Sequence, residues 1–129
     1  MQTFLPYPDF SASARVLDYR RAGKQRVEAF QILKALYDSN YGWQNHPAVK
    51  MWRGYEEALK VYFNAVSLEW VKRGYQHTMG FFEVESYELP VWFGNEDFHY
   101  SHRSNLYYKN PVYYFGWTGV AKVDYVWPI

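Results

Sequence analysis

The chain has 129 residues, no cysteine and a formal net charge of +1. This length suits one domain with a sizeable core, and the lack of cysteine excludes disulfides and thiolate metal sites and fits a reducing compartment. Aromatic residues make up 22% of the chain, so we expect some of them to line a surface or a groove. No apolar run suits a signal peptide or a membrane span, which predicts a soluble cytoplasmic protein.

The charges are unevenly distributed along the sequence. Between Asp18 and Glu28 every charged side chain is positive, whereas between Gly74 and Phe98 every charged side chain is negative. A local cationic site can therefore coexist with a near-neutral total charge. The small total excludes a generally basic nucleic-acid binder, and any DNA footprint is expected to neutralise few phosphates.

The first predicted element is an extended apolar segment, Met1–Phe10, packed against the body of the domain. A short helix capped by Ser11 or Ser13 should follow and run to about Tyr19. Apolar side chains at helical spacing then predict a helix over about Arg21–Asp38. Its apolar stripe consists of Val27, Phe30, Leu33 and Tyr37.

The middle of the chain contains the longest predicted helix. Gly23, in the preceding helix, is expected to allow close approach of another backbone. Asp38–Gln44 is predicted to be a loop from its Ser, Asn and Gly content. One long helix is then expected over Pro47–Arg73, because proline fits the first helical position and Gly74 is a natural stop.

The last third of the chain is predicted to be mostly loop and tail around one helix. Phe81–Trp92 reads as a long acidic loop, in which alternating residues allow a short strand. A helix capped by Asn95 or Asp97 should run to about Lys109, before a turn at Pro111 and an aromatic tail. We therefore predict an all-α fold, a compact single domain over residues 1–129 with about three to four helices, long aromatic loops and a C-terminal tail.

The first candidate site is the basic cluster that opens the second predicted helix. It mixes guanidinium, ammonium and amide groups and ends in the carboxylate of Glu28, a mixture suited to holding phosphate. The alternative is a solvated helix face, on which Lys24 and Glu28 form an exposed pair of small value. The nucleic-acid contacts predicted here are Arg20, Arg21, Lys24, Gln25 and Arg26.

A second candidate site precedes the long predicted helix. Trp43 and Asn45 supply a flat ring and an amide that can contact a nucleic acid, and His46 can exchange a proton near neutral pH. The alternative for His46 and Asn45 is a simple helix cap.

Two further clusters lie near the C-terminus. The His99-x-x-His102 pair lacks a third ligand at recognisable spacing, so we predict no metal site and no cofactor. Contacts to phosphate or base are expected instead from His102 and Arg103. Tyr113 and Tyr114 are predicted to stack on bases, although most of the aromatic tail reads as core.

Together these residues make the chain resemble the pyrimidine-dimer DNA glycosylase family, the phage endonuclease V family. The resemblance is carried by Tyr19–Lys24, Lys72–Tyr75 and Pro111–Gly116. Three further runs are similar to a bacterial and phage branch of that family. They are Met1–Phe10, Gly23–Glu28 and Asn45–Pro47.

The resemblance implies an all-helical fold and a two-step reaction on double-stranded DNA. The amine at the chain start attacks the sugar C1′, expels the damaged base and forms a Schiff base, and a glutamate then assists strand cleavage. In this chain the position after Arg20, where the family has glutamate, holds Arg21, and the nearest downstream carboxylate is Glu28. Residue 2 is Gln2, too large for ordinary removal of Met1.

The expected function is therefore a DNA glycosylase, with possible abasic-site lyase activity, acting on a damaged or modified base. Met1 would supply the nucleophilic amine, Glu28 the carboxylate, and His46 would position or exchange a proton. The alternative is a non-catalytic protein that keeps the fold and binds a nucleotide or nucleic acid, which the cation at Arg21 favours. A monomer with DNA as its partner and no membrane contact is expected.

Overall fold

The computed structural model describes residues 1–129 and consists of five α-helices and one turn of 3₁₀ helix, without strands. This confirms the predicted all-α class. No helix combines the length and the apolar character needed to cross a membrane. In chain order the elements are α1 (Phe10–Val16), α2 (Tyr19–Tyr37), α3 (Pro47–Lys50), α4 (Glu56–Lys72), α5 (Glu96–Lys109) and η1 (Phe115–Trp117).

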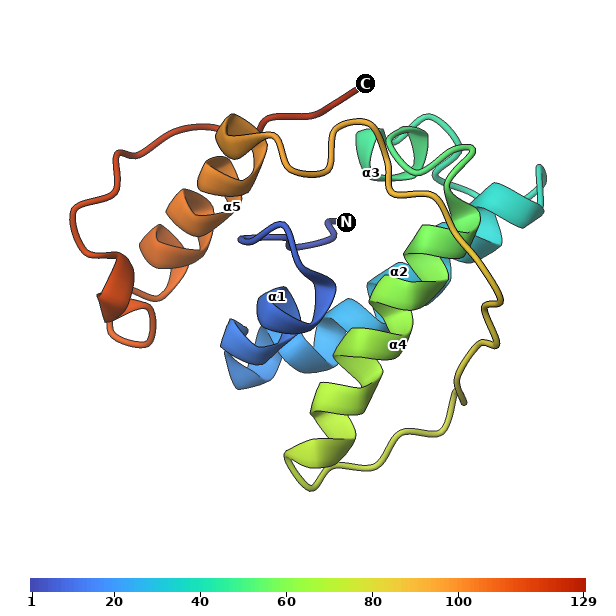
Figure 1. Ribbon diagram of the computed structural model, residues 1–129, viewed down its shortest axis with the longest axis horizontal. Helices are drawn as coiled ribbons and strands as arrows, with labels where there is room; N and C mark the ends of the chain where they lie inside the picture. Colours follow the sequence, from blue (N-terminus) through green and yellow to red (C-terminus); the bar gives the residue numbers. More distant parts are fainter.

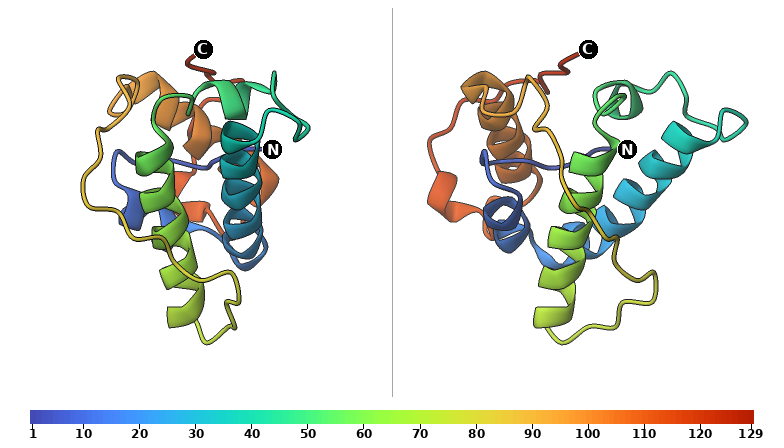
Figure 2. Two further views of the ribbon diagram at one scale, coloured as in Figure 1. Left: turned by 90° about the vertical axis from the view of Figure 1, so that its right-hand side faces the viewer. Right: turned by 45° about the vertical axis from the view of Figure 1, so that its right-hand side comes forward.

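The helices surround the extended start of the chain. α2 and α4 pack side by side, with α1 against α4, and α5 lies on the other side of the chain start (Figure 1). The loop between α4 and α5 runs along the outside of the molecule, and the N-terminal segment crosses its middle (Figure 2). Residues 2–5 are therefore buried among helices from every part of the chain.

The N-cap residues of α1 and α5 can be compared with the predicted caps. Asp9, not Ser11 or Ser13, caps α1, because its side chain accepts the backbone N–H of Ala12 at 2.7 Å. Asn95 caps α5 as predicted, since its side chain accepts from the N–H of Phe98. An N-cap side chain satisfies one of the free donors at a helix start.

The single helix predicted over residues 47–73 is wrong, because the chain turns between α3 and α4. Gly54 in this turn has a φ of +90°, a conformation that L side chains rarely adopt and glycine takes readily. The turn places the indole of Trp52 in the core, where its Nε1–H donates to Thr3 Oγ1 at 3.0 Å. The break thus connects α3 to the buried start of the chain.

The predicted short strand near Phe82 does not form. The backbone of Phe82 pairs instead with the side chain of Asn64 on α4, donating its N–H at 2.9 Å and accepting at 2.8 Å. One amide side chain thereby replaces a strand partner and fixes the loop along α4.

The buried face of α2 also differs from the predicted apolar stripe. Val27 and Tyr37 are 40% and 63% exposed. The helix instead buries a face on which three alanines let it approach α4 closely. The buried residues of α2 are Ala22, Gln25, Ala29, Ile32, Leu33 and Ala35.

Gly23 allows a close approach, but the neighbour is a side chain rather than a backbone. A Cβ at this position would lie 2.8 Å from Cη2 of Trp70. The indole cannot easily yield, because its Nε1–H donates to the carbonyl of Gln76 and its ring stacks on Tyr19 and Tyr75.

Gly23→Ala is therefore expected to destabilise the protein by about 1 kcal/mol. Overpacking costs about 1–3 kcal/mol, of which alanine recovers about 1 kcal/mol through its better helix propensity. Urea unfolding measures the difference. Gly42→Ala is the matched control, since a Cβ there meets nothing within 4 Å, and equal stability of the two variants would contradict the packing argument.

Candidate active site

The backbone of the chain start is held by buried side chains rather than by a neighbouring strand. Gln25, on α2, is 1% exposed and makes the central contacts. Its Nε2–H donates to the carbonyl of Gln2 at 2.9 Å, and its Oε1 accepts the N–H of Phe4 at 2.8 Å. The hydroxyl of Tyr62, on α4, donates to the carbonyl of Phe4. The N-terminal nitrogen is thereby delivered to one face of α2.

Two histidines of α5 extend this arrangement by one residue. His102 Nδ1 accepts the N–H of Leu5 at 2.8 Å, and His99 Nδ1 lies 2.7 Å from the carbonyl of Leu5. His99 Nε2 accepts the N–H of Gly94, so its Nδ1 carries the proton that is donated to Leu5. The pair anchors α5 to the chain start, and because both rings are fully buried neither can reach a ligand from solvent.

Glu28 lies one turn after Gln25 on the same face of α2. Its Oε2 accepts the N–H of Gln2 at 3.3 Å and the Nε2–H of Gln25 at 2.9 Å. Its Oε1 lies 3.8 Å from the ammonium of Lys24, whose side chain is exposed, so this long contact adds little energy. The carboxylate is thus held against the nitrogen of residue 2.

The chain start and Glu28 open into a pocket of about 460 Å³. Its lining combines four cationic side chains with a single carboxylate, so an anionic ligand is favoured. The lining residues are Met1, Gln2, Phe4, Arg20, Arg21, Lys24, Gln25, Glu28, Lys109 and Tyr125. A larger pocket of about 580 Å³ is lined by Glu56, Glu57 and Glu88 and would repel DNA.

The cations of the pocket differ in how freely they can meet a ligand. Arg21 is partly committed, because its guanidinium pairs with the buried carboxylate of Asp18 at 3.1 Å. Arg20 and Lys24 are exposed. The Met1 amine forms none of the ion pairs of the structure.

His46 lies near the pocket although it does not line it. It is the N-cap of α3, where its Nδ1 accepts the N–H of Ala48 at 3.0 Å, so its Nε2 carries the proton when the ring is neutral. Burial lowers its pKa, the charge of the chain start lowers it further, and Glu28 acts in the opposite direction. The pKa of His46 therefore depends on the charges of both the N-terminal amine and Glu28.

Trp43 and Asn45 are exposed next to His46. The indole meets the imidazole edge-on, with ring centroids 5.8 Å apart. Trp43 has a φ of +73°, the only non-glycine residue with positive φ. For a bulky side chain this is a strained conformation, of a kind that clusters at functional sites.

The comparison with protein families was decisive. A family model described as pyrimidine dimer DNA glycosylase matches residues 1–83. The chain belongs to this family. No curated protein and no solved structure matches the chain. The family acts on DNA, which agrees with the anion-binding character of the pocket.

The family model covers part of the pocket lining. Eight of the ten residues that line the pocket fall within residues 1–83, and the other two, Lys109 and Tyr125, come from beyond it. The predicted site residues did not include Gln2, Phe4, Lys109 or Tyr125. Nothing in the sequence near Lys109 and Tyr125 indicates that the C-terminal segment folds back over the chain start. The burial of Gln25 was detectable, since it falls on the helical face of Ala22 and Ala29.

Two of the predicted nucleic-acid contacts, Arg26 and Arg103, lie outside the pocket and bind other parts of the protein. Arg26 stacks on Trp70 and bonds His77. Arg103 donates to the carbonyl of Pro6 and pairs with Glu96. These two guanidiniums hold loops in place rather than lining the pocket.

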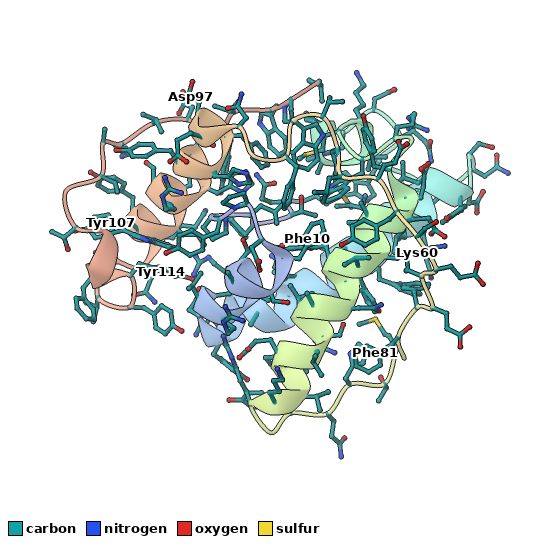
Figure 3. The ribbon with its side chains drawn as sticks, viewed as in Figure 1. Phe10, Lys60, Phe81, Asp97, Tyr107 and Tyr114 are labelled. Atoms are coloured by element: carbon teal, nitrogen blue, oxygen red, sulfur yellow. The ribbon has the colours of Figure 1, made fainter.

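Burial removes three other predicted contacts from the surface. Gln25 and His102 are almost fully buried, and Tyr114, labelled in Figure 3, is buried. The hydroxyl of Tyr114 donates to Asp18 Oδ1. Tyr113 is half-exposed, but its hydroxyl donates to the carbonyl of Leu17 outside the pocket. The structure thus corrects the assignment of His102 and Tyr114 as DNA contacts, whereas Gln25 lines the pocket with its amide engaged by the chain start and Glu28. No cluster of three or more His, Asp or Glu side chains forms a metal site.

Proposed function

We propose that this chain is a DNA glycosylase with abasic-site lyase activity, in which Met1 supplies the nucleophilic amine and Glu28 the carboxylate. The proposal rests on the 3.3 Å hydrogen bond between the backbone N–H of Gln2 and Glu28 Oε2. The Met1 amine is one residue away, within about 7 Å of the same carboxylate. Both groups belong to a pocket lined with cations, and the family acts on DNA.

In this mechanism the Met1 amine displaces the base and Glu28 assists strand cleavage. The lone pair of the amine forms a bond to the sugar C1′ while the bond from C1′ to the base breaks and its electron pair leaves with the base, which takes up a proton. Proton loss from the nitrogen and opening of the sugar ring give a Schiff base. Glu28 then accepts a proton from C2′, and the 3′ phosphate departs.

The cations hold the DNA around this centre. Arg20 and Lys24 are exposed and face the same pocket as the amine, so they can pair with phosphates on either side of the displaced nucleotide. Arg21 contributes charge while it remains paired with Asp18. His46, kept neutral by its lowered pKa, can donate a hydrogen bond from Nε2 to the leaving base.

Gln25 is a positioning residue in this scheme. One amide group bonds both the backbone of residue 2 and the carboxylate of Glu28. It therefore fixes the distance between the N-terminal nitrogen and the proton acceptor without touching substrate. Reacting groups held at fixed separation react faster, because orientation entropy is lost before the reaction.

We infer that residues 1–129 act as one functional domain, acting as a monomer. α5 contacts the chain start through His99 and His102, and its last residue, Lys109, lines the pocket. Removal of the segment beyond residue 83 would expose Leu5 and open the pocket.

The proposal is tested with a labelled DNA duplex that carries a single thymine dimer. The protein is expected to cut this duplex at the lesion and to leave the undamaged duplex intact. A variant with two extra residues before Met1 should bind the damaged duplex and fail to cut it, because its amine is displaced. Equal cutting by the extended variant would exclude the amine mechanism.

The binding-protein alternative predicts another outcome of the same experiment. Arg21, a cation where the family has its glutamate, favours this alternative. In that case both the unmodified and the extended protein would bind the damaged duplex and neither would cut it, even at enzyme concentrations above that of the DNA.

A further inference from the structure

One wall of the pocket is built by the part of the chain beyond the family match. Lys109 is the last residue of α5, and Tyr125 belongs to the C-terminal tail. Both line the same pocket as Glu28 and the chain start. Arg20 and Lys24, from α2, line it together with them.

The ring of Tyr125 is fixed, but its hydroxyl has no partner in the protein. The ring packs edge-on against His102, with centroids 5.6 Å apart, and also contacts Phe4. Burial raises the pKa of the hydroxyl to about 12, with Arg21 lowering it and Glu28 raising it. The group therefore stays protonated near neutral pH and presents an unused donor close to the catalytic carboxylate.

Lys109 is likewise unpaired. It is exposed and takes part in none of the ion pairs, side-chain hydrogen bonds or cation–π contacts of the structure. Most other cations of the C-terminal half are engaged: Arg103 pairs with Glu96, and Lys122 lies over the ring of Tyr108. A free ammonium at the mouth of a cationic pocket is suited to a phosphate.

We propose that Lys109 and Tyr125 complete the DNA site, with Lys109 holding a backbone phosphate and Tyr125 donating a hydrogen bond to an uncharged acceptor oxygen of the displaced nucleotide. That oxygen belongs to the sugar or to a base carbonyl, since Arg20, Lys24 and Lys109 supply the phosphate contacts of the same pocket. The inference rests on the proposed function and adds a substrate contact from the segment beyond residue 83.

The role of Lys109 is tested by the salt dependence of DNA binding. Lys109→Gln is expected to weaken binding of a thymine-dimer duplex about threefold and to reduce the slope of log affinity against log salt by about 0.9, the value for one phosphate contact. Lys122→Gln is the matched control and should leave the slope unchanged. Equal slopes for both variants and the unmodified protein would overturn the assignment.

The role of Tyr125 is tested with Tyr125→Phe, which keeps the packed ring and removes only the hydroxyl. Affinity for the dimer duplex is expected to fall about five- to tenfold, the value of one hydrogen bond. Tyr107→Phe is the control, because Tyr107, labelled in Figure 3, is a half-buried tyrosine of α5 that does not line the pocket. Thermal unfolding should be unchanged in both variants.

A second duplex identifies the acceptor oxygen. A tetrahydrofuran abasic duplex keeps the sugar oxygen and lacks the base. If Tyr125→Phe binds both duplexes more weakly than the unmodified protein, the acceptor is a sugar oxygen. If it binds only the dimer duplex more weakly, the acceptor is a base carbonyl. No loss on either duplex overturns the proposal, whereas an unmodified protein that prefers neither damaged duplex would instead contradict the proposed function.

Discussion

Replacing Glu28 with glutamine is expected to lower the rate of strand cleavage at a thymine dimer by about 10²- to 10⁴-fold, the usual contribution of a general base. DNA binding should remain. Both hydrogen bonds that orient the carboxylate reach one oxygen, Oε2, from Gln2 and Gln25. The amide oxygen of a glutamine can take that place, so the variant loses the base and keeps the geometry.

Single-turnover cleavage and a binding titration on the same duplex measure the two effects separately. Glu57→Gln serves as the control, because that carboxylate is exposed, pairs with Lys60 and lies outside the pocket. A Glu28→Gln protein that cuts at the unmodified rate would remove the carboxylate from the mechanism. A Glu28→Gln protein that no longer binds the duplex would show that Glu28 is needed for the structure of the site.

Acid is expected to destabilise the protein through His102. Burial lowers the pKa of His102 to about 3, whereas a histidine in the unfolded chain titrates near 6.5. Below pH 6.5 the unfolded chain therefore binds a proton that the folded chain excludes, and the free energy of unfolding falls with pH until about pH 3. The loss is about 2 kcal/mol between pH 6.5 and pH 5. His99, whose pKa is also lowered by burial, acts in the same direction.

His102→Asn isolates this effect. The asparagine oxygen can accept the N–H of Leu5 in place of Nδ1 but does not titrate. Urea unfolding at pH 7 and pH 5 should show a smaller loss of stability for the variant, by about 2 kcal/mol. An identical pH dependence in both proteins would mean that His102 titrates normally and is not sealed in the core.

Local signals predicted the helices well where their ends carry local chemistry. Asn95 and Lys109 bound α5 as expected, since capping is decided within one turn. The break at Gly54 was missed, because the apolar stripe continues through it from Val49 to Leu59. The turn is stabilised by the hydrogen bond between Trp52 and Thr3. These residues are far apart in the sequence, so no local pattern predicts their contact.

The candidate site was predicted in part. The basic run of α2 and the resemblance together indicated Met1, Arg20 and Glu28, which line one pocket. The sequence predicts Gln25 and His102 as nucleic-acid contacts, because polar residues are usually exposed. In this fold they satisfy the backbone of a buried segment that has no strand beside it.

In the proposed mechanism an α-amine at the chain start reacts with the sugar. Borohydride reduction of the protein mixed with an abasic-site duplex, followed by peptide mapping, tests it most directly. We expect a covalent adduct on the nitrogen of Met1, retained in Lys24→Gln and Lys109→Gln variants. An adduct on a lysine side chain, or cleavage without any adduct, would contradict it.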